Sequence, residues 1–137
     1  MKKLELTLLL AISPLVVFCQ LISGIENADD STAVKIYRVV DVEPVFSYQG
    51  MDLFQYFKYQ SSVPISDSRE SKDVVYFQVT IEESGEVSGF KILVGVSREL
   101  DEYTEELVMS MPKWNPGTIA GKPVKVVKNL SISYSKR

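Results

Sequence analysis

The stretch VVYFQVTIE, residues 74–82, decides the fold. Its side chains alternate between apolar and mostly polar, and this alternation is the pattern of a β-strand with one buried face. The residues expected to face the core are Val75, Phe77, Val79 and Ile81. After this strand, residues 83–86 (ESGE) supply a turn in which Gly85 can adopt a positive φ. An antiparallel hairpin is therefore predicted, with a return strand carried by Phe90, Ile92, Val94 and Val96.

Helical spacing of apolar side chains occurs on both sides of this hairpin. Residues 50–59 place Leu53, Phe54 and Phe57 on one stripe, which predicts a short amphipathic helix packed on the core. A second helix is predicted after Ser97, a candidate N-cap. Its apolar stripe consists of Leu100, Tyr103, Leu107, Val108 and Met111.

The last predicted strand, residues 124–134, alternates in the same way as the first. Its core face is expected to carry Val124, Val126, Leu130, Ile132 and Tyr134, and its other face Lys125, Val127, Asn129, Ser131 and Ser133. Upstream, residues 34–42 are rich in β-branched side chains and are stopped by Pro44, as an edge strand or extended arm would be. The predicted class is α+β: a small antiparallel sheet of about three strands, with a candidate N-terminal arm, covered by two helices.

Composition limits the chemistry that this chain can perform. Its 137 residues include one cysteine and no histidine, which excludes a Cys–His dyad, a Ser–His–Asp triad, a His/Cys metal site and an internal disulfide. The 15 basic residues are mixed with 18 acidic ones, so nucleic acid is not a predicted partner. We predict no cofactor, no metal and no enzymatic activity. The acidic residues of the second helix lack a calcium-binding loop and are interpreted as a solvated face: Asp101, Glu102, Glu105 and Glu106.

The first residues predict export. Lys2 and Lys3 precede an apolar run of about thirteen residues, which suits a signal peptide better than a ~20-residue membrane span. Val17 and Cys19 are small enough for cleavage after Cys19, giving a signal peptide (1–19), a flexible tether (20–33) and a folded domain (34–137). Two alternatives stay open: lipid modification of Cys19, which would hold the protein on a membrane, and an uncleaved anchor. All three predict a periplasmic or secreted domain.

The run MSMPKWNPGT at residues 109–118, followed by GKPV at 121–124, resembles the TonB C-terminal domain family, in particular its Bacteroidetes-type versions. The hairpin and the acidic helix precede this run in the family's order, so the resemblance covers about residues 34–134. Upstream, the family's usual Pro-Gly-Gly is replaced by SYQG at residues 47–50. The motif residues are Pro112, Trp114, Pro116, Gly117 and Gly121, and we interpret Trp114 as a plug at the end of the core.

The resemblance implies that the last strand is an edge that accepts an extended segment of an outer-membrane TonB-dependent transporter or another envelope protein. The partner-binding residues are then Lys125, Val127, Asn129, Ser131 and Ser133. Alternatively, the same edge completes a purely structural or inhibitor-like module, or pairs two copies in a homodimer. Energy transduction is a further alternative, although the tether contains no proline and is short for crossing the periplasm.

We predict cleavage between Cys19 and Gln20, because a charged start, a short apolar run and small residues occur in the order that a signal peptidase requires. Mass spectrometry of the mature protein should find Gln20 at its amino terminus. An intact Met1 would contradict export by cleavage, and a diacylglyceryl group on Cys19 would instead support a membrane-held form.

Overall fold

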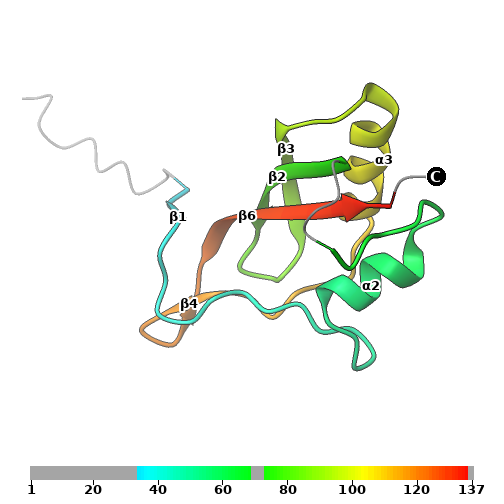
Figure 1. Cartoon of the computed structure of the whole chain (residues 1–137). Helices are drawn as coiled ribbons and strands as arrows, with labels where there is room; N and C mark the ends of the chain where they lie inside the picture. Colours follow the sequence, from blue (N-terminus) through cyan, green and yellow to red (C-terminus); the bar gives the residue numbers. More distant parts are fainter. Residues whose placement is uncertain (1–33, 69–72, 136–137) are drawn as a thin grey trace, which may run out of the picture. The chain divides into compact units, whose positions relative to one another are not determined.

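The computed structural model describes residues 34–68 and 73–135. The predicted signal peptide, its cleavage or lipid modification at Cys19, and the tether lie outside these ranges. Six strands and two helices are formed within them (Figure 1). In chain order they are β1 (Ile36–Tyr37), α2 (Leu53–Gln60), β2 (Asp73–Ile81), β3 (Val87–Val94), α3 (Arg98–Met109), β4 (Thr118–Ile119), β5 (Lys122–Pro123) and β6 (Lys125–Tyr134).

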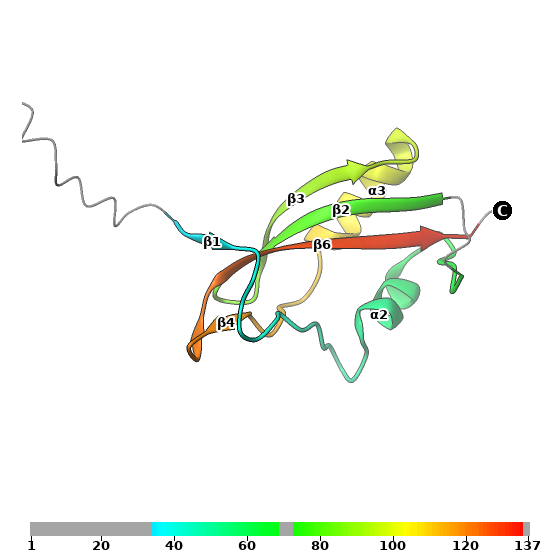
Figure 2. The ribbon, with the colours of Figure 1, turned by 60° about the vertical axis from the view of Figure 1, so that its left-hand side comes forward.

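Four of the strands form one sheet in the order β1-β6-β2-β3, as seen in Figure 2. β2 is antiparallel to both of its neighbours, and its pairing with β6 runs without interruption from Asp73↔Tyr134 to Ile81↔Val126. β1 is parallel to β6 and pairs with it only at Ile36↔Lys125 and Tyr37↔Val126. β4 and β5 form a separate two-stranded sheet. The predicted α+β class is confirmed.

The core lies on one face of this sheet. All four apolar residues of the alternating stretch in β2 are buried, with exposed fractions of 1% or less. Both helices pack against that face, and each buried side chain of this size contributes about 1.5–3 kcal/mol to folding. The buried apolar residues of these elements are Tyr56 and Phe57 from α2, Leu107 and Val108 from α3, and Val126, Ile132 and Tyr134 from β6.

Trp114 closes one end of the core. Its side chain is 4% exposed, and its ring lies edge-on to Phe46 with the centroids 5.5 Å apart. The backbone N–H of Trp114 donates to the Gly85 carbonyl at 2.8 Å. This hydrogen bond holds the turn between β2 and β3 against the turn that follows α3. Gly85 has a φ of +87°, and a Cβ there would lie 2.0 Å from the Trp114 carbonyl oxygen. Only glycine fits this contact without movement of the backbone.

A buried hydroxyl pair holds the other end. The Thr104 hydroxyl donates to the Leu100 carbonyl at 2.7 Å, so its proton is used and the Tyr134 hydroxyl donates to Thr104 Oγ1 at 2.8 Å. Burial raises the pKa of Tyr134 to about 12. The phenol is therefore neutral over the physiological range, and it joins the end of β6 to α3.

The first predicted helix differs from the observed one in its start and in its buried face. α2 begins at Leu53 because Asp52 forms a capping box: its carboxylate accepts from the Gln55 N–H at 2.8 Å, and the Gln55 side chain accepts from the Asp52 N–H at 3.1 Å. The helix then buries Tyr56 and Phe57, whereas Phe54 is 42% exposed. The expectation that Phe54 belongs to the core was wrong, because the buried stripe of the helix follows Tyr56 and Phe57 and Phe54 lies to one side of it.

Two strand predictions also need correction. The arm at 34–42 forms a strand only at Ile36–Tyr37, after which the chain bends away and makes single bridges at Val42↔Thr118 and Val45↔Asn115. In the hairpin, the return strand ends at Val94, and Val94 and Val96 are exposed rather than buried. The register between β2 and β3 shifts next to Val94, where Leu93 is an extra residue. The alternation of inward and outward side chains is therefore interrupted at this point of β3.

We predict that Gly85→Ala destabilises the fold by about 3 kcal/mol or more, since the positive φ costs about 1–2 kcal/mol and the overlap with Trp114 adds an overpacking cost. Gly121→Ala is the matched control, because Gly121 also has a positive φ (+75°) but a Cβ there would meet nothing within 4 Å. Urea denaturation measures both losses. Equal losses in the two variants would contradict the docking of the hairpin turn on Trp114.

Candidate functional site

The outer edge of β6, on the side away from β2, is partly covered at its end. The Ser66 N–H donates to the Ser133 carbonyl at 2.8 Å, and the Ser135 N–H donates to the Pro64 carbonyl at 2.7 Å. Odd-numbered residues of β6 therefore direct their backbone groups away from β2. In an extended strand, residues two apart direct these groups to the same side.

The backbone groups of Asn129 and Ser131 consequently point to this outer edge as well. β1 lies beside the start of the edge, where Ile36 and Tyr37 are in register with Lys125 and Val126, and the segment around Ile65 covers its end. Between these two ends, no described residue pairs with the backbone of Asn129 or Ser131 on the outer side. We call these outward N–H and C=O groups of Asn129 and Ser131 the open edge.

The outer edge of β3 also lacks a partner strand among the described residues, but its geometry is less regular. The pairing of β3 with β2 shifts twice, leaving Leu93 and Ser88 as extra residues, and the exposed Lys91 lies between the two irregularities. Bulges and an exposed lysine are devices that hinder pairing at a sheet edge. β6 pairs with β2 over nine residues without a shift, so it presents the more regular edge.

The five predicted partner-binding residues share one face of β6, opposite the face that packs on the helices. Two of them already have side-chain partners in the sheet. Lys125 Nζ lies 2.8 Å from the Glu82 carboxylate, and Asn129 Oδ1 accepts from Gln78 Nε2 at 3.0 Å. Ser131 is exposed, while Val127 and Ser133 are half-buried.

The ion pair of Lys125 with Glu82 belongs to the start of the strand. Hydrogen bonding from Lys125, and then from Ser88, lowers the pKa of the Glu82 carboxyl below its ordinary value. Lys125 is thus neutralised within its own sheet, and its backbone is paired with β1. Of the five predicted residues, Asn129 and Ser131 are the two that form the open edge.

A groove of about 240 Å³ lies beside the open edge, and sequence reasoning did not predict it. It runs between β6, α2 and the segment after Pro64. Its lining residues are Leu53, Phe54, Phe57, Ile65, Ser66, Asp67, Ser68, Ser131, Ile132 and Ser133. The exposed Phe54 belongs to this lining, so the ring that the hydrophobic pattern assigned to the core instead faces a surface groove.

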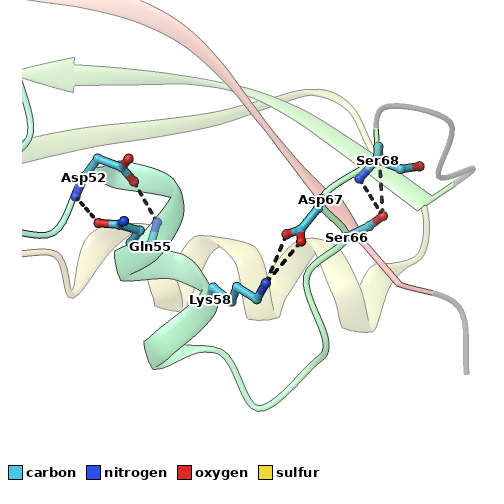
Figure 3. Close-up of polar contacts among 6 residues, drawn as sticks. All are labelled: Asp52, Gln55, Lys58, Ser66, Asp67 and Ser68. Carbon is cyan, nitrogen blue, oxygen red and sulfur yellow. Dashed lines mark hydrogen bonds and ion pairs between the residues drawn. The ribbon is translucent and has the colours of Figure 1, made fainter.

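Figure 3 shows how one wall of the groove is held. Lys58, near the end of α2, reaches the Asp67 carboxylate at 3.1 Å. The Ser66 hydroxyl accepts from the Ser68 N–H at 3.1 Å and so closes a tight turn beside it. Both charged side chains are exposed, and such surface pairs contribute about 0–1 kcal/mol. The wall is positioned without being rigidly fixed.

The acidic residues of α3 do not form a second site. Glu102, Glu105 and Glu106 are exposed, and Asp101 instead accepts from the Val96 N–H at 3.0 Å, which ties the loop before α3 to the helix. Over residues 34–68 and 73–135 there is no group of three or more His, Cys, Asp or Glu side chains placed to hold a metal ion. Within the same ranges, no helix has the length and apolar character needed to cross a membrane.

The domain therefore consists of two helices on one face of a mixed sheet, with an open edge on the last strand. The sequence model of the family described as Gram-negative bacterial TonB protein C-terminal matches residues 65–135, a little over half of the chain. The chain belongs to this family. Comparison with curated proteins finds no match. Domains of this family are protein-interaction domains associated with TonB-type transport in the cell envelope, where they engage outer-membrane transporters.

Proposed function

We propose that this chain is an exported, non-enzymatic envelope protein that binds an extended segment of an outer-membrane transporter, or of another envelope protein, by strand addition at β6. The observation that carries this proposal is the open edge. Asn129 and Ser131 present outward backbone groups that pair with no residue of 34–68 or 73–135, between two ends that are already covered. The family supports a protein as the ligand.

The size of the open edge sets the expected strength of binding. Asn129 and Ser131 offer two N–H donors and two C=O acceptors, and each hydrogen bond contributes about 0.5–1.5 kcal/mol net. Backbone pairing alone therefore gives weak binding that does not depend on sequence. Side-chain contacts beside the strand must supply the remaining affinity and the selectivity.

Strand addition uses only backbone N–H and C=O groups, so the proposed binding requires no catalytic side chain and no cofactor. Two other outcomes remain distinguishable by experiment. Pairing between two copies at β6 would give a homodimer, and force transmission would require a connection to an energised inner-membrane complex. Capture of the purified domain's partners from an envelope extract separates transporter binding from self-association.

We predict that Asn129→Pro abolishes partner capture while the domain stays folded. The Asn129 N–H points away from β2, so proline removes an outward donor and leaves the hydrogen bonds between β2 and β6 in place. Asn129→Ser is the control, because it keeps every backbone group and should reduce capture little.

The measurement is a pull-down from a membrane extract of the protein's own organism, with circular dichroism to confirm folding of both variants. Recovery of an outer-membrane transporter by the unmodified domain and not by Asn129→Pro is the expected result. A folded Asn129→Pro variant that captures the same partner with unchanged affinity would rule out strand addition at this edge. Recovery of the chain's own second copy alone would indicate dimerisation instead.

A further inference from the structure

We propose that the groove beside β6 receives one apolar side chain of the strand that adds at the open edge, and thereby selects which segments bind. The inference rests on the proposed strand addition. The groove would require a feature of the partner that backbone pairing cannot select. The bound segment must carry one aliphatic or other medium-sized apolar side chain at a fixed position.

The groove and the open edge are continuous. Ser131 contributes to both, since its backbone faces outward and it also lines the groove together with Ile132 and Ser133. α2 forms the opposite wall. Side chains of an added strand alternate between the two faces of the sheet, so every second one points to the face that α2 covers. A strand paired with Ser131 therefore directs a side chain toward the groove.

The chemistry of the lining favours an apolar occupant. Among the described residues of the lining, the hydrophobic part consists of Leu53, Phe54, Phe57, Ile65 and Ile132, and Asp67 is the one acidic member. Asp67 is paired with Lys58, so the described part of the rim offers no uncompensated charge to a charged side chain. A charged occupant would lose hydration without gaining a partner, and an apolar one would cover exposed hydrophobic surface.

The volume of the groove restricts what it can hold. About 240 Å³ is below the range of about 300–1,000 Å³ that is usual for small-molecule sites. It suits one side chain rather than a cofactor. The polar part of its described lining is small, with serines at positions 66, 68, 131 and 133.

The pairing of Ser66 with Ser133 places the groove at one end of the open edge. A strand added at Asn129 and Ser131 meets the segment from Pro64 to Ser66 directly beyond that end, so it cannot continue along β6. Only the residue of the bound segment nearest that end can reach the groove. The preference should therefore appear at a single position of the bound segment and not at every second one.

The experiment uses a random heptapeptide library displayed on phage and selected against the purified domain. Four forms are compared: the unmodified domain, Phe54→Asp, Tyr59→Asp and Asn129→Pro. Phe54→Asp places a carboxylate in the groove wall. Tyr59→Asp makes the same kind of change on the same helix at a side chain that is 76% exposed and does not line the groove.

The unmodified domain and Tyr59→Asp should enrich peptides that share one apolar position. Phe54→Asp should bind these peptides about tenfold more weakly or worse and lose the positional preference, as expected when an apolar pocket loses its complementarity. Asn129→Pro should enrich none of them. Circular dichroism and thermal melting confirm that all four forms are folded.

The experiment distinguishes an error in the groove inference from an error in the proposed strand addition. If Asn129→Pro abolishes selection but no apolar position emerges, or if Phe54→Asp behaves like Tyr59→Asp, the groove inference is overturned and strand addition stands. If Asn129→Pro still enriches the same peptides, the proposed function itself fails. A library from which the unmodified domain enriches no peptide also overturns the groove inference.

Discussion

The regular antiparallel ladder between β2 and β6 is the constraint on which the rest of this domain depends. Because the pairing runs without a shift from Asp73↔Tyr134 to Ile81↔Val126, the two strands keep their alternation in phase over their common length. A slip of one residue would expose the apolar face of one strand and bury polar residues such as Asn129. The ladder thus fixes the buried face, the position of both helices and the backbone groups of β6 that face away from the sheet.

Function follows from what covers those outward groups. β1 pairs with the first residues of β6, the segment around Ile65 pairs with the last, and the open edge lies between them. Short coverage at both ends limits the length of any added strand, which protects the domain from indiscriminate edge pairing. It also limits the affinity that backbone pairing can provide. The apolar groove next to Ser131 is placed where additional affinity and selectivity can be gained.

Periodicity in the sequence was sufficient to predict the elements that pack on a common core. The alternation of Val75 to Ile81 and the outer face of the last strand correspond to observed features, because each reflects burial of one face of one strand. The predicted cap at Ser97 is also observed, because it needs only a local hydrogen bond from the Leu100 N–H. The exposed position of Phe54 was not predicted, because the apolar spacing placed Phe54 on the core stripe and left out Tyr56, which is buried. A short helix with aromatic side chains on several sides does not reveal from its apolar spacing alone which of them faces the core.

Features that join distant segments could not be predicted from periodicity. The parallel pairing of Ile36–Tyr37 with β6, the ion pair of Lys125 with Glu82 and the groove between α2 and β6 depend on how separate elements meet in space. Residue-resolved amide hydrogen exchange tests the open edge most directly, in the free domain and with a captured partner. We expect Asn129 and Ser131 to exchange fast and Lys128 and Leu130 slowly, with protection of Asn129 and Ser131 on binding. Slow exchange of Asn129 and Ser131 in the free domain, or binding that protects β3 instead, would contradict this account.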